Sequence, residues 1–223
     1  MDLFRQAWEY GQSHSEEFWL ATIQHLQLSF TALAIAAIIC IPLGIFTSRF
    51  GFISRIIINF FGVARVIPSI AVLLVLLPVL GVGFTPAVVA LSFLAFPPIL
   101  INTDAGLRGV DRATLEAARG MGMSWWDSLR RVEIPLALPV IIGGLRTATV
   151  EVIASATLAA FIGAGGYGDF ITQGLAGSDN RVLLVGAIPV AILAAASELL
   201  LGYLQRRTNP KNEGPKKLKT TQA

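Results

Sequence analysis

The sequence contains uncharged apolar stretches that are too long for the interior of a soluble domain. Leu26–Ser48 carries no charged residue, and Val66–Thr103 is uncharged and almost long enough for two membrane passes. A helix rises about 1.5 Å per residue, so about 20 apolar residues cross the hydrocarbon core of a bilayer. Only 14% of the residues are charged, against about a quarter in soluble domains. These features predict an all-α, polytopic membrane protein.

Five transmembrane helices are predicted. The second is the hardest to place, because it must begin near Phe52 and reverse at the turn Pro78–Pro86, and so carries Arg65 and Pro68. We interpret it as one span with a break near Pro68; two short helices are the alternative. The other predicted spans are Leu26–Ser48, Pro86–Thr103, Pro135–Ile162 and Val182–Leu204.

The distribution of lysine and arginine predicts the orientation of the chain. With five spans, most basic residues fall on one side, in the segments Arg49–Arg55, Arg108–Arg131 and Arg206–Lys219. Cytoplasmic loops are enriched in lysine and arginine, so this side is predicted to be cytoplasmic. The predicted organisation is an extracytoplasmic N-terminal segment, a transmembrane domain with a cytoplasmic loop, and a disordered cytoplasmic tail, spanning residues 1–23, 24–204 (loop 104–134) and 205–223.

Several classes of chemistry are excluded by composition. The single cysteine, Cys40, rules out an intramolecular disulfide and a cysteine-based metal site. His14 and His25 have no cysteine or histidine at ligand spacing, so no metal site is predicted. There is no phosphate-binding GxxxxGK[ST] loop and no hydrolase pattern, so the chain is expected to have no catalytic residues and no cofactor.

The polar middle segment, Asp104–Glu133, is too long for a simple turn between two helices. Asp111 is suited to cap a first short helix, and Gly120 and Gly122 are suited to end it. Ser124 is suited to cap a second short helix, with Pro135 in the first turn of the following span. The sequence therefore predicts two short helices within the loop.

Trp125 and Trp126 stand beside Met121 and Met123 in this polar segment. Aromatic residues and methionine are enriched in the cores of protein interfaces, which favours a knob that fits a groove on a partner protein. Tryptophan is also enriched where membrane and water meet, which favours an aromatic belt. The residue pattern alone does not separate these two interpretations.

The spacing Glu116-Ala117-Ala118, Gly122, then Val132-Glu-Ile-Pro135 resembles the EAA signature of ABC importer permeases. That signature is EAA, three residues, Gly, nine residues, then I-x-L-P, and the departures here are conservative. The resemblance implies the type I ABC permease fold, with coupling helices that sit in a groove of the ATPase subunit. It implies this ATPase-coupling role for Glu116, Ala117, Ala118, Gly122 and Pro135, and for the neighbouring Trp125 and Trp126.

Three further stretches are similar to permeases of the osmoprotectant group, namely Ala64–Ala71, Ile134–Thr147 and Thr157–Gly168. The resemblance implies import of glycine betaine, choline and carnitine by alternating access, as a pair of permease subunits in the bacterial or archaeal cell membrane. It implies ATPase subunits that bind ATP, and an extracytoplasmic solute-binding protein. Alternatives are a permease for methionine or another small solute, and a secondary transporter, although no internal repeat is visible.

Charged residues inside the predicted spans need a partner or water, because a charge in the bilayer centre costs at least a few kcal/mol. These residues are Arg65, Arg146, Glu151 and Glu198. Arg146 and Glu151 are five residues apart and do not form a good helical pair. Arg65, Arg146 and Glu151 are candidates for a translocation pathway or subunit interface; structural packing is the alternative for each.

Overall fold

The computed structural model describes residues 2–209, and every regular element among them is helical. The part of the tail beyond residue 209, including the predicted disordered lysines, lies outside the described residues. The elements, in chain order, are α1 (Asp2–Ser13), α2 (Ser15–Thr47), α3 (Gly51–Ala64), α4 (Ser69–Leu80), α5 (Phe84–Arg108), α6 (Arg112–Gly120), α7 (Trp125–Ser128), the π-helix η1 (Leu129–Glu133), α8 (Ile134–Ser155), the 3-10 helix η2 (Ala156–Ile162), α9 (Tyr167–Ala176) and α10 (Asn180–Arg207).

Four described stretches are long and apolar enough to cross a membrane alone: α2, α5, α10 and the continuous run Trp125–Ile162. Helix α2 has 33 residues and so is about 50 Å long at about 1.5 Å per residue. It therefore extends beyond a hydrocarbon core of about 30 Å. Its start at Ser15 lies well before the predicted apolar run, with Glu16 and Glu17 favourably placed in the first turn.

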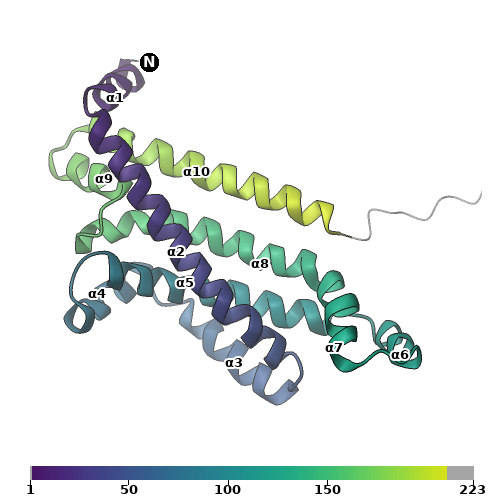
Figure 1. The fold of residues 1–223 in the computed structure, drawn as a ribbon. Coiled ribbons are helices and arrows are strands. Elements are labelled where there is room, and N and C mark those ends of the chain that lie inside the picture. The colour runs from purple at the N-terminus through teal and green to yellow at the C-terminus, as the bar shows by residue number, and fades with distance from the viewer. Residues whose placement is uncertain (1, 210–223) are drawn as a thin grey trace, which may run out of the picture.

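The predicted break at Pro68 is confirmed. Helix α3 ends at Ala64 and α4 begins at Ser69, with Pro68 as its N-cap. Proline disfavours the helical conformation of the preceding residue, which explains why the chain cannot continue as one helix. Neither half spans a bilayer alone, but Figure 1 shows α3 beside the end of α2 and α4 near the opposite end. Together they return the chain across the bundle before Gly81 and Gly83, both with positive φ, lead into α5.

The helices pack closely because small residues lie at their crossings. The main apolar core joins α2, α5 and α8, with Leu28, Leu91 and Val152 almost fully buried. A Cβ on Gly144 of α8 would lie 2.6 Å from the Pro98 carbonyl oxygen of α5. Small residues that allow backbones to approach are typical of helix packing in lipid.

The polar loop is shorter than predicted. Helix α5 continues past Thr103 to Arg108, so Asp104 is a buried helical residue and not the start of a loop. Arg108 neutralises the Asp104 carboxylate and Ser54 donates a hydrogen bond to it, which allows this carboxylate to be buried. The second predicted short helix is not separate either, because α7, η1 and α8 form one run into the membrane.

Figure 1 places the short elements at the two ends of the bundle. Helices α6 and α7 lie at the end where α10 finishes, whereas α1, α4 and α9 lie at the opposite end. Helix α9 has 10 residues, too few to cross a membrane alone.

Candidate functional site

Helix α6 is built as its sequence predicts. The Asp111 carboxylate caps it by accepting a hydrogen bond from the Thr114 backbone N–H at 3.3 Å. The chain leaves the helix through Gly122, whose φ of 78° lies in the left-handed region that favours glycine. Glu116 and Ala117 are exposed, whereas Ala118 is buried against the protein. The exposed side of α6 therefore presents the acidic member of the EAA signature.

The two tryptophans form an exposed apolar knob. The side chain of Ser124 accepts a hydrogen bond from the Asp127 N–H at 3.2 Å, which begins α7. Trp125 and Trp126 follow with exposures of 56% and 60%, and their ring centroids are 5.9 Å apart. Met121 beside them is also exposed. Such a group of large apolar side chains on a surface marks an interaction site.

One edge of the knob is fixed to the membrane domain through Arg49, in the turn between α2 and α3. The Arg49 guanidinium lies 2.7 Å from the Glu133 carboxylate, and 5.4 Å from the centroid of the Trp125 ring. Glu133 is buried and also accepts a hydrogen bond from Ser128 at 3.3 Å. Arg49 therefore contacts both ends of the α7–η1 segment, the tryptophan end and the end that joins α8.

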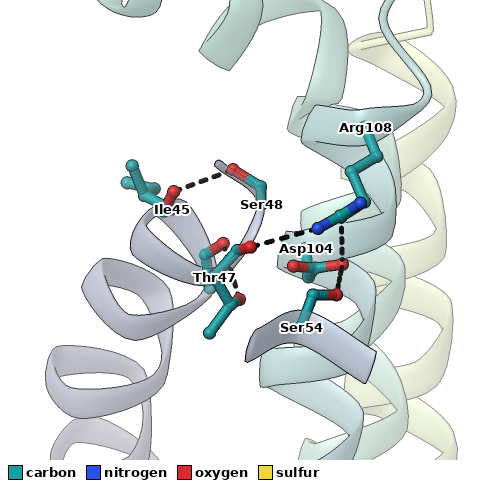
Figure 2. A network of polar contacts seen from close by, with 7 residues as sticks. Ile45, Thr47, Ser48, Ser54, Asp104 and Arg108 are labelled. Carbon is teal, nitrogen blue, oxygen red and sulfur yellow. Dashed lines mark hydrogen bonds and ion pairs between the residues drawn. The ribbon is translucent and has the colours of Figure 1, made fainter. Parts of the chain in front are cut away.

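A second polar network fastens the same end of the bundle (Figure 2). Ser54 of α3 donates a hydrogen bond to Asp104 Oδ2 at 2.9 Å, and Arg108 Nε lies 3.0 Å from the same oxygen. Arg108 also donates to the Thr47 carbonyl at 3.2 Å. The network joins the end of α2, the start of α3 and the end of α5. The network therefore holds these three helix ends together, next to Arg49.

Sequence reasoning missed Arg49, Ser54 and Arg108 as parts of this site. Arg49 and Arg108 had been used only to predict the orientation of the chain. The partners of Arg49 and Ser54 are distant in sequence, whereas Arg108 stands four residues after its partner Asp104. Asp104 and Glu133 were expected as the ends of a polar loop, and the structure buries both. The signal that could have suggested them is a charged residue at each boundary between an apolar run and a polar segment.

The charged residues inside the spans form two separate pairs. Arg65, at the break between α3 and α4, donates to Glu151 of α8 at 3.1 Å. Arg146 of α8 pairs with Glu198 of α10 and donates to Gln205 at 3.2 Å. As expected from their spacing, Arg146 and Glu151 do not pair with each other. Among residues 2–209, no three His, Cys, Asp or Glu side chains come together as metal ligands.

The chain matches known transport proteins over most of its length. Residues 40–210 match the family described as "Binding-protein-dependent transport system inner membrane component". The chain is 41% identical over 200 residues to the glycine betaine/carnitine/choline transport system permease protein OpuCB of Bacillus subtilis (strain 168), covering 90% of this chain and 92% of that protein. It is 40% identical over 195 residues to the osmoprotectant import permease protein OsmW of Salmonella typhimurium (strain LT2), covering 85% and 91%.

The fold is shared with a solved transporter. The chain resembles a chain of the MetNI methionine ABC transporter in an inward facing conformation, with a TM-score of 0.73 at 22% identity, covering 87% of this chain and 95% of that one. At this identity the likeness concerns the fold alone. The family match and the identity to OpuCB show that this multi-pass inner membrane protein belongs to the family of binding-protein-dependent transport system inner membrane components, as the permease component of an ABC transporter.

Proposed function

We propose that this chain is the permease subunit of an importer for quaternary-amine osmoprotectants: glycine betaine, carnitine and choline. The observation that carries the proposal is the 41% identity to the glycine betaine/carnitine/choline permease OpuCB across 90% of the chain. The osmoprotectant permease OsmW supports the same class of solute at a similar identity. The permease pairs with a second copy or a paralogue, and a separate binding protein delivers the solute from outside.

The tryptophan knob and α6 together form the docking surface for the ATPase subunit. Glu116, Gly122 and the two tryptophans lie at one polar, exposed end of the bundle. The transmembrane helices themselves need neither an exposed charge nor exposed tryptophans at that end. Movement of this surface reaches the spans directly, because α7 continues through η1 into α8. Arg49 adds a second connection, from Trp125 and Glu133 to the turn before α3.

The proposed topology has the docking end in the cytoplasm, and the positive-inside rule supports it. Arg49, Arg55, Arg108 and the arginines of Arg112–Arg131 gather at this end, whereas the other end has Arg5 on α1 and Arg181 at the start of α10. The N-terminus is then outside and the C-terminal end of α10 inside. With this orientation, the tryptophan knob lies in the cytoplasm, where ATP is available to the ATPase subunit.

Transport by the reconstituted complex tests the substrate class. The permease is purified with its ATPase and binding protein, placed in liposomes, and supplied with ATP and labelled glycine betaine, carnitine, choline or methionine. ATP-dependent uptake of the quaternary amines, with no competition from methionine, is expected. Uptake of methionine in preference to all three amines would overturn the proposal.

A further inference from the structure

Helix α8 has one polar face that no other described helix covers. Its buried side, with Ala148 and Val152, packs into the core, and Arg146 faces α10. Thr147, Glu151 and Ala154 follow at helical spacing on a third side, where Thr147 and Ala154 are exposed and Glu151 is partly exposed. Arg65 reaches this side from the α3–α4 break.

Lipid is not a suitable medium for this face. Glu151 lies 17 residues (151 − 134) beyond Ile134, or about 25 Å along the helix, so it still lies within a hydrocarbon core of about 30 Å. The side chains of Arg65 and Glu151 keep exposures of 47% and 32%. Charged groups within a membrane protein face the bundle interior or a water-filled cavity. The open face of the pair therefore points to an aqueous passage and away from lipid.

We propose that the Arg65–Glu151 pair is a transit site for the solute, at which a zwitterion takes the place of both ionic partners. This inference rests on the proposed function. The quaternary ammonium of the solute lies by the Glu151 carboxylate. A quaternary ammonium has no N–H to donate, so the carboxylate attracts it by charge alone. The carboxylate of glycine betaine or carnitine lies by the Arg65 guanidinium, which binds carboxylates with two parallel hydrogen bonds.

The geometry suits brief occupation by a solute that must leave again. A partly exposed ion pair is weak, so its opening opposes the solute only slightly. When the solute is bound, each protein charge keeps an opposite charge beside it, so neither is left unpaired in the span. Arg65 belongs to a joint between two short helices, whereas Glu151 belongs to a continuous helix. Opening the pair therefore frees the joint relative to α8.

Choline provides the decisive comparison, because it has the quaternary ammonium but no carboxylate. Uptake of glycine betaine, carnitine and choline is measured in liposomes with wild type, R65Q, R65K and E151Q. R65Q is expected to reduce the two zwitterions roughly tenfold more than choline, the size of one lost charge-assisted contact. R65K keeps the charge without the planar fork and is expected to give a smaller ratio. E151Q is expected to reduce all three solutes.

R146Q is the matched control, because Arg146 is paired in the same helix but faces α10. Its effect is expected to be equal for the three solutes. ATPase activity stimulated by the binding protein is measured in parallel, because variants that do not assemble lack it. If R65Q does not assemble, the loss of zwitterion uptake relative to choline uptake is taken from R65K instead.

Two results would overturn the inference. One is that R65Q, or R65K where R65Q does not assemble, reduces choline and carnitine by the same factor. The other is that E151Q leaves the uptake of choline unchanged, since the Glu151 carboxylate is the group of the pair by which the quaternary ammonium is proposed to lie. A wild-type complex that moves none of these amines would overturn the proposed function and this inference with it, whereas equal losses with intact wild-type uptake overturn the inference alone.

Discussion

Arg49 and Glu133 are 84 residues apart in the chain (133 − 49), and their side chains meet at 2.7 Å at the end of the bundle that carries α6 and α7. The Arg49 side chain is 25% exposed and that of Glu133 only 4%. The same guanidinium lies over the Trp125 ring. A single side chain thus connects the turn between two spans to the segment that precedes a third.

Replacing Arg49 by alanine is expected to destabilise the protein and to uncouple ATP hydrolysis from uptake. Removing one partner of a buried pair costs about 3–5 kcal/mol, and the partial exposure of Arg49 places the expected loss at the lower end. Thermal unfolding of the purified complex and uptake per ATP hydrolysed are the measurements. R131A is the control, because the Arg131–Asp127 pair is exposed and 3.6 Å long. Equal unfolding temperatures for R49A and R131A would contradict the prediction.

The double variant W125A/W126A is expected to lose binding to the ATPase subunit. A tryptophan at the centre of an interface commonly contributes about 2 kcal/mol or more, so the loss of even one such contribution should lower affinity by roughly thirtyfold. Affinity is measured by co-purification and titration of the ATPase in detergent. W19A is the control, since Trp19 is 63% exposed but lies in the first turns of α2, near α1. Unchanged ATPase affinity in W125A/W126A would place the docking surface elsewhere.

G122A is expected to impair coupling through backbone strain. An alanine in the left-handed conformation of Gly122 costs roughly 1–2 kcal/mol, and the turn after α6 would shift to relieve it. Uptake and ATPase activity are compared with those of G120A, in which no atom lies within 4 Å of the added Cβ and φ is not positive. G120A should behave as wild type; equal behaviour of the two variants would exclude a conformational role for Gly122.

G144A is expected to destabilise the contact between α5 and α8. Its Cβ would lie 2.6 Å from the Pro98 carbonyl oxygen and 2.7 Å from Asn102 Cβ. Forcing extra volume into a packed contact costs typically about 1–3 kcal/mol. G62A has open space around the new Cβ and serves as the control in thermal unfolding. Equal unfolding temperatures for G144A and G62A would contradict the prediction, because α5 and α8 would then be able to move apart without loss of stability.

Cysteine labelling tests the orientation. Ser13 lies on α1 and Arg119 on α6, at opposite ends of the bundle, and both are exposed. The native Cys40 is buried and should react little. A membrane-impermeant maleimide is expected to label S13C in intact cells and R119C only after permeabilisation. The reverse pattern would invert the proposed topology.

The sequence was sufficient for the helical membrane class, the break at Pro68, the cap at Asp111 and the cap at Ser124. These depend on local physics: the length of apolar runs, the restriction that proline imposes, and hydrogen bonds within a few residues. The EAA spacing identified the family for the same reason, since all residues of this motif lie within a stretch of 20 residues (135 − 116 + 1).

The boundaries and partners of the charged residues depended on the tertiary structure. From the sequence, Asp104 and Glu133 were expected to be exposed residues of a polar loop, because nothing in the sequence indicates that the fold buries their carboxylates. Their burial is possible because Ser54 and Arg49 reach them from distant parts of the chain, while Arg108 pairs with Asp104 from one turn further along the same helix. Arg65 and Glu151 likewise became a pair through the packing of the broken helix against α8. Local propensity determines where helices form, whereas compensation of a buried charge requires groups that only the folded chain brings together.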